Sequence, residues 1–149
     1  MQNGTRYPVF ELKDVDGRTV SSSDLAQRWF LLYWYPMAET PGCIAQATSL
    51  RNQIRAFDTL DCVVIGASFD LPEVNAAFKS KHQLPFRVLS DATRELALAV
   101  GAVDDSEAAT PKRIAHLVTP GGIVARRYVV ESPGMFAEDV LDDLEALAG

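Results

Sequence analysis

The sequence predicts an α/β fold in which a central mixed β-sheet is flanked by helices and preceded by an N-terminal β-hairpin. Continuous apolar runs, typical of strands that are covered on both faces, alternate with segments whose apolar residues recur at helical spacing. Turn signals stand near both ends: an Asp-Gly pair early in the chain and a Gly-Gly pair late in it. Strands alternating with helices, followed by a terminal hairpin and helix, favour a layered α/β sheet.

The first half of the chain predicts the hairpin, two central strands and one helix. Residues 10–20 alternate loosely around Asp16-Gly17, which indicates a hairpin. The apolar runs 29–35 and 62–68 are typical of buried strands. Between these runs, one apolar face at helical spacing predicts a helix that turns Cys43 toward protein. Its members are Ile44, Ala47, Leu50, Ile54 and Phe57.

Two helices are predicted in the middle of the chain. Asp70 and Glu73 read as a capping pair around Pro72, at the start of a helix that runs to about His82. A second helix is expected over residues 91–100, ending at Gly101.

The last third predicts one more central strand, a hairpin and a final helix. The apolar run 114–119 is joined by Gly121-Gly122 to a strand over residues 123–130. Ser132-Pro133 then reads as the cap of the last helix. The apolar residues of this helix are Phe136, Val140, Leu141, Leu144 and Leu147.

Length and composition favour one domain over residues 1–149. The chain is 48% hydrophobic and 23% charged, and its net charge of −6 disfavours nucleic acid or an anionic membrane surface as a partner. We expect no membrane span, because no apolar run approaches the roughly 18 residues required. A polar N-terminus and only two cysteines favour a cytoplasmic protein without a disulfide framework.

The turn from the first central strand into the first helix carries the best clue to function. Thr40 reads as the helix N-cap and Pro41 as the first helical residue, which puts Cys43 in the first turn. Free N–H groups and the positive end of the helix dipole favour a thiolate there. Because position 40 holds threonine, the Cys-x-x-Cys pair of disulfide reductases is absent, and a single sulfur suits attack on a small oxidant.

These residues resemble the peroxiredoxin family. Pro36, Thr40 and Cys43 reproduce its Pro-x-x-x-Thr-x-x-Cys signature, and Thr-Pro-Gly-Cys after an aromatic strand is similar to the bacterioferritin comigratory protein (peroxiredoxin Q) branch. The resemblance covers most of residues 8–148. It implies a thioredoxin-like fold and a thiol peroxidase without metal or organic cofactor, in which Cys43 becomes a sulfenic acid. Other matching segments are Val63-Val64-Ile65-Gly66-Ala67-Ser68, Leu84-Pro85-Phe86, Leu89-Ser90-Asp91 and Arg113.

The expected catalytic residues are Cys43, Thr40, Arg113 and Pro36. Lowering a thiol pKa from about 8.5 to about 6 requires roughly 3.4 kcal/mol. A helix N-terminus contributes about 0.3–1 kcal/mol and at best about 2 kcal/mol, so a fixed cation is needed as well. Arg113 is the candidate, because it opens an antiparallel strand near the end of the sheet where Cys43 lies, and the resemblance also implies an arginine here. Thr40 Oγ, nearby N–H groups and Arg113 would stabilise the departing peroxide oxygen, while Pro36 shields the sulfur.

Recycling of the sulfenic acid is expected to use an outside thiol. Related peroxiredoxins often carry a resolving cysteine five positions after the reactive one, where this chain has Thr48. Cys62 opens the second central strand, about 20 Å from the site at 3.3 Å per residue, and a disulfide requires Cα atoms within about 7 Å. We therefore predict a one-cysteine peroxidase, a monomer or homodimer, reduced by thioredoxin, glutaredoxin or a small thiol. The alternative is a two-cysteine peroxidase that uses Cys62.

Simpler interpretations stand beside these predictions. Cys43 could be a small buried helix residue, and Arg113 a solvated side chain. Cys62 and His116 are expected to pack in the core, whereas His82 is expected at the surface. The two cysteines and two histidines of the chain do not have the spacing of zinc ligands. Two other functions stay open: a thiol-disulfide oxidoreductase acting on proteins, and a redox-sensing or binding module without turnover.

Overall fold

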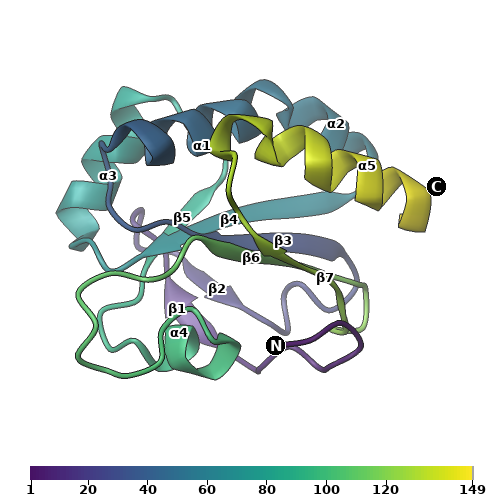
Figure 1. Cartoon of the computed structure of the whole chain (residues 1–149), viewed down its shortest axis with the longest axis horizontal. Helices are drawn as coiled ribbons and strands as arrows, with labels where there is room; N and C mark the ends of the chain where they lie inside the picture. Colours follow the sequence, from purple (N-terminus) through teal and green to yellow (C-terminus); the bar gives the residue numbers. More distant parts are fainter. Residues whose placement is uncertain (149) are drawn as a thin grey trace.

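The computed structural model describes residues 1–148 and contains a five-stranded sheet between two unequal layers (Figure 1). The strands are β1 (Glu11–Lys13), β2 (Thr19–Ser21), β3 (Trp29–Trp34), β4 (Cys62–Ser68), β5 (Arg87–Ser90), β6 (Ile114–Val118) and β7 (Val124–Val129). The helices are α1 (Pro41–Asn52), α2 (Ile54–Thr59), α3 (Pro72–Lys81), α4 (Glu95–Val100), the 3₁₀ turn η1 (Pro133–Met135) and α5 (Phe136–Ala148).

The central sheet is mixed, as predicted. Its strand order is β5-β4-β3-β6-β7, with β3, β4 and β5 parallel and with β6 antiparallel to β3 and β7. The three predicted buried runs form its three middle strands. The edge strand β5 has only four residues, which is too short to stand out as an apolar run. Because β6 runs against β3, the start of β6 lies beside the end of β3.

Both faces of the sheet are covered, which explains why its three middle strands, β3, β4 and β6, are continuously apolar. Helices α1, α2, α3 and α5 cover one face, and α4 with the β1–β2 hairpin covers the other (Figure 1). Along β3, Leu31 and Tyr33 pack into the first layer, whereas Phe30, Leu32 and Trp34 pack into the second. Cys43 belongs to the same buried layer as Leu31 and Tyr33.

Both predicted hairpins are confirmed. The β1–β2 ribbon turns at Gly17, and β6 and β7 are joined through Gly121 and Gly122. All three glycines have positive φ, between 83° and 100°, a conformation that costs other residues free energy. The glycine signals thus identified these turns correctly.

Several predicted helix boundaries are corrected. The first helical stretch is broken at Gln53 into α1 and α2. Helix α4 is shorter than expected and starts at Glu95, because Arg94 adopts a left-handed conformation at its N-cap. Its predicted end at Gly101 is confirmed. At the last helix, Ser132 precedes the 3₁₀ turn η1 and makes no side-chain capping bond.

The predicted capping pair at Asp70 and Glu73 is wrong. Leu71 is the N-cap of α3, and no side chain caps the helix. Asp70 instead accepts hydrogen bonds from the backbone N–H of Ala38 and the hydroxyl of Ser68, each at 2.9 Å. Its carboxylate therefore ties the segment after β4 to the segment after β3. Within residues 1–148, no helix is long and apolar enough to cross a membrane.

His116 lies in the core, as expected. Its side chain is fully buried on β6, with its ring 5.8 Å from that of Tyr7, and neither ring nitrogen has a hydrogen-bond partner within residues 1–148. Burial, with smaller contributions from the N-terminal amine and Arg127, lowers the pKa of His116 from 6.5 to about 4. The folded protein thus keeps this imidazole neutral at neutral pH.

This burial predicts an acid-sensitive fold. Below pH 6.5 the unfolded chain binds a proton that folded His116 does not bind until about pH 4, so stability falls as the pH drops through that window. Between pH 7 and pH 5 we expect His116 to cost about 2 kcal/mol in the free energy of unfolding. Urea denaturation of wild type and His116→Leu at both pH values measures this, and an equal acid loss in both proteins would contradict it.

Candidate active site

The reactive-thiol candidate Cys43 is the third residue of α1 and only 1% exposed. The chain leaves β3 through Tyr35, whose N–H bonds the carbonyl of Ala67, and then crosses five loop residues before α1 begins. Thr40 is extended at the N-cap position, and its carbonyl accepts the N–H of Ile44 at 2.9 Å. The predicted helix start is therefore confirmed, with Pro41 as its first residue. The sulfur lies inside the protein, in the first turn of a helix.

Arg113 reaches the same point from a distant part of the sequence. It immediately precedes β6, whose antiparallel register on β3 pairs Ala115 with Tyr33. Its Nη2 lies 3.5 Å from the Cys43 sulfur, and its Nη1 donates a 2.9 Å hydrogen bond to Gln46 Oε1. The guanidinium thus contacts both the sulfur and the Gln46 amide, and it lies where the sequence predicts a cation beside Cys43.

Gln46 is a site residue that the sequence analysis missed. It is fully buried, one helical turn after Cys43, and it orients Arg113 through its side-chain oxygen. The sequence did contain a signal for it, because Gln46 is a polar residue on the otherwise apolar face of the predicted helix. Buried amides require a partner, so such a residue marks a polar contact made by the facing element.

Gly42 makes room for the arginine. A Cβ atom at this position would lie 2.9 Å from Arg113 Nη2 and 3.8 Å from Pro133 Cγ. Ordinary carbon–nitrogen contacts are longer, so a side chain here would push the guanidinium away from the sulfur. The small residue before the cysteine is therefore part of the geometry of the site.

Two buried tyrosines, Tyr33 and Tyr35, lie in the same core cluster as Cys43. Tyr33 packs closely against Gly66: its Cζ and its hydroxyl oxygen both lie 3.0 Å from the position that a Cβ atom of residue 66 would occupy. Burial, and then the neighbouring Tyr35 and Cys43, raises the pKa of Tyr33 well above its usual range, against the opposing effect of Arg113. Tyr33 therefore remains a neutral phenol in the neighbourhood of Cys43.

A polar network holds the loop behind these tyrosines. The hydroxyl of Tyr35 donates a 2.6 Å hydrogen bond to Asn75 Oδ1, and Asn75 Nδ2 donates to Ser68 Oγ at 2.9 Å. Ser68 in turn donates to Asp70, the carboxylate that binds the N–H of Ala38. The start of the loop is thereby tied to α3 through Asn75, and its middle to the segment after β4 through Asp70.

Of the four predicted residues, Cys43 and Arg113 are brought into contact, while Thr40 and Pro36 lie in the preceding loop. The Thr40 hydroxyl donates to the carbonyl of Met37 at 2.7 Å, so it bonds the loop rather than a helix N–H. Pro36 is partly buried directly after Tyr35. In this position the Thr40 oxygen can still accept a hydrogen bond, but its hydroxyl must rotate away from Met37 to donate one to a ligand.

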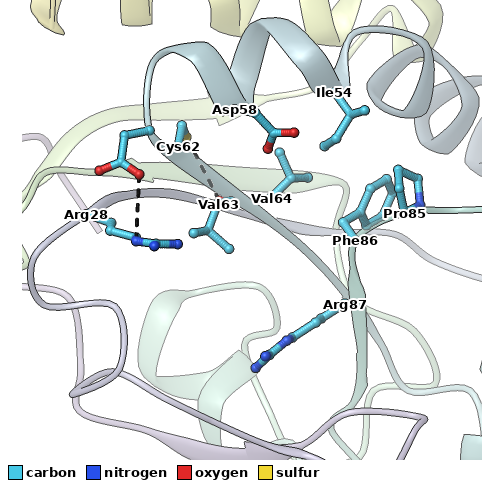
Figure 2. Close-up of a pocket in the computed structure, with 10 residues that line it drawn as sticks. Arg28, Ile54, Asp58, Cys62, Val63, Val64, Pro85, Phe86 and Arg87 are labelled. Carbon is cyan, nitrogen blue, oxygen red and sulfur yellow. Dashed lines mark hydrogen bonds and ion pairs between the residues drawn. The ribbon is translucent and has the colours of Figure 1, made fainter.

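Cys62 lies at the opposite end of the sheet. It opens β4 beside Trp29 and lines a cavity of about 450 Å³ with Arg28, Asp58 and Phe86 (Figure 2). Burial, and then the charge of Asp61, raises the pKa of this thiol to about 12. Both cysteines are free, and Cys62 remains a thiol at neutral pH. Within residues 1–148, no three potential metal ligands of the His, Cys, Asp and Glu types gather in one place.

Comparisons with known proteins find relatives of this chain in sequence and in fold. The sequence pattern of the AhpC/TSA family matches residues 3–127. A putative peroxiredoxin of Mycobacterium tuberculosis is 36% identical over 88% of this chain and 79% of its own length. A chloroplastic peroxiredoxin Q of Suaeda salsa is 33% identical over 99% of this chain and 69% of its length. The crystal structure of peroxidoxin BcpB from M. tuberculosis has a TM-score of 0.92 at 26% identity, covering 100% of this chain and 99% of that one.

The close approach at Gly42 generates a prediction. In Gly42→Ala, the new methyl group should displace Arg113 and slow oxidation of Cys43 by hydrogen peroxide roughly tenfold, because a hydrogen bond to a charged group contributes about 1.5–3 kcal/mol. Stopped-flow mixing with peroxide, followed by mass analysis of Cys43, measures the rate. Gly134→Ala is the matched control, since its Cβ would meet no atom within 4 Å. Equal rates in both variants would contradict the steric role of Gly42.

Proposed function

We propose that this chain, which belongs to the AhpC/TSA family and is a thiol peroxidase of the peroxiredoxin Q branch, works by a one-cysteine mechanism with Cys43 as its nucleophile. The observation that carries the proposal is the 3.5 Å contact between the Cys43 sulfur and the guanidinium of Arg113 inside a closed site. Hydrogen peroxide and organic hydroperoxides are the proposed substrates.

In the first step, the Cys43 thiolate attacks one oxygen of the peroxide. A sulfur–oxygen bond forms while the oxygen–oxygen bond breaks, so sulfur is oxidised by two electrons and the peroxide is reduced. The departing oxygen takes up a proton and leaves as water or an alcohol, and the protein keeps a sulfenic acid. Arg113, the N–H groups at the start of α1 and the Thr40 hydroxyl are the donors proposed to stabilise the departing oxygen.

Ionisation alone would not make the reaction fast. An ordinary thiol is already about 3% ionised at pH 7, so full ionisation gains roughly 30-fold at most, and nucleophilicity falls as acidity rises. Larger gains come from donors that interact more strongly with the transition state than with the bound peroxide. We therefore assign Arg113 two roles, as counter-ion of the sulfur and as donor to the departing oxygen, with Gln46 fixing its orientation.

The return step needs a thiol from outside the chain. Peroxiredoxins are reduced by thiols, and thioredoxin, glutaredoxin and small thiols are the candidates here. The first thiol attacks the sulfenic sulfur, forms a mixed disulfide and releases water; a second thiol then frees Cys43 as a disulfide leaves. Cys62 is a poor resolver, because it is buried, protonated and separated from Cys43 by the length of β4, about 20 Å.

A reducing compartment suits this cycle, since both cysteines are free thiols. We accordingly propose that the enzyme acts in the cytoplasm. Its assembly as a monomer or a homodimer does not change the chemistry proposed for Cys43, because every group invoked belongs to the same chain.

Replacement of each cysteine tests the assignment of roles. Cys43→Ser should abolish peroxide consumption, whereas Cys62→Ser should retain most of it, because the latter residue lies outside the site. After one equivalent of peroxide, mass spectrometry of the wild type should find Cys43 oxidised with Cys62 still reduced. A Cys43–Cys62 disulfide formed within one chain in high yield would instead establish the two-cysteine alternative.

A further inference from the structure

Glu39, in the loop before the reactive cysteine, has a strained backbone and an anchored side chain. Its φ of 67° lies in the left-handed region, which glycine enters freely and glutamate does not. Its carboxylate nevertheless makes two contacts: an ion pair with Lys81 Nζ at 2.8 Å and a hydrogen bond with His82 Nε2 at 2.7 Å. These contacts join the loop to the C-terminal end of α3.

The partners of Glu39 are themselves fixed. The carbonyl of His82 accepts a 2.8 Å hydrogen bond from Arg51 on α1, and its ring packs against Phe78 at 5.1 Å between centroids. The side chain of His82 is only 16% exposed, compared with 68% for Lys81. His82, predicted at the surface, is thus a largely covered link between α1, α3 and the loop.

The loop is consequently held at two adjacent residues. Asp70 binds the N–H of Ala38 before α3 begins, and the contacts of Glu39 fix the next residue to the end of the same helix. Cys43, which follows in the first turn of α1, is 1% exposed. A small peroxide can reach such a sulfur, but a protein thiol must bring its own sulfur to about 2.05 Å to form the mixed disulfide. The loop must move for that second reaction.

We propose that Glu39 is a positioning residue whose contacts with Lys81 and His82 form a latch on the loop, and that this latch restricts access of protein-sized thiols to oxidised Cys43. The inference rests on the proposed function of Cys43. While the latch is closed, the loop keeps the sulfur enclosed for reaction with peroxide. When it opens, the sulfenic sulfur becomes accessible to a bulky reductant, so the latch influences which class of thiol recycles the enzyme.

Glu39→Gln tests the latch, because it removes the charge and keeps the size of the side chain. Amide exchange in residues 36–43 of the reduced protein should rise roughly threefold, as expected for loss of the exposed ion pair with Lys81 and weakening of the hydrogen bond to His82. The rate of sulfenic acid reduction by thioredoxin, divided by the rate with dithiothreitol, should rise by a similar factor. A small thiol depends less on loop movement, so this ratio separates access from general damage to the site.

Asp16→Asn is the matched control, since Asp16 binds Lys79 on the same helix at 2.8 Å but does not contact the loop. It should leave both the exchange of residues 36–43 and the rate ratio unchanged. Unaltered exchange and an unaltered ratio in Glu39→Gln would overturn the latch, as would equal changes in the control. Failure of the proposed function would look different: Cys43→Ser would still consume peroxide, whatever the exchange of the loop.

Discussion

The candidate site depends on one contact, between the buried sulfur of Cys43 and the positively charged guanidinium of Arg113. Burial of an unpaired ion is costly, and the fields of a helix N-terminus offset only a small part of that cost. Cys43 is 1% exposed, and the cation that we propose as the counter-ion of its thiolate is Arg113, 70 positions further along the chain. Every nearby feature of the fold can be understood as a means of bringing these two groups together and holding them.

The topology of the sheet brings Cys43 and Arg113 to the same edge. The parallel strands β3 and β4 end where the loop enters α1, and antiparallel β6 begins at that same edge. Arg113 therefore stands at the first position before β6 and Cys43 at the third position of α1. Fine adjustment then falls to small local features: Gly42 leaves space for the guanidinium, and Gln46 fixes its rotation.

The sequence allowed the main layout of the site to be predicted because that layout follows from topology. Continuous apolar runs identify the buried strands, and the Thr-Pro start of α1 locates Cys43. An arginine just before an antiparallel strand follows from the same reasoning. These signals are local, and the packing of the sheet then converts them into one distant contact.

The missed details depend on side-chain partners far away in the sequence. Asp70 has the pattern of a helix cap, yet its carboxylate binds the N–H of Ala38, which no local pattern records. Glu39 looks like an ordinary loop glutamate until Lys81 and His82 are placed beside it. The same holds for the Thr40 hydroxyl. From the sequence it could cap a helix N–H or bond a loop carbonyl, and in the structure it donates to the carbonyl of Met37.

The two thiols have different surroundings because they occupy different positions in the fold. Cys43 has a cation, a helix N-terminus and a neutral phenol around it, whereas Cys62 has burial and a nearby carboxylate that keep it protonated. The difference does not come from the sulfur itself. It comes from which end of the central strands each residue occupies.

The most direct measurement is the second-order rate of Cys43 oxidation by hydrogen peroxide in Arg113→Met, with Arg113→Lys as the variant that keeps the positive charge. Loss of a preorganised donor typically lowers a rate by about 10²–10³, so the methionine variant should fall by at least about 100-fold and the lysine variant by less. A folded Arg113→Met enzyme that reacts within about threefold of the wild type would contradict the account, because the charge on the sulfur would not need this guanidinium.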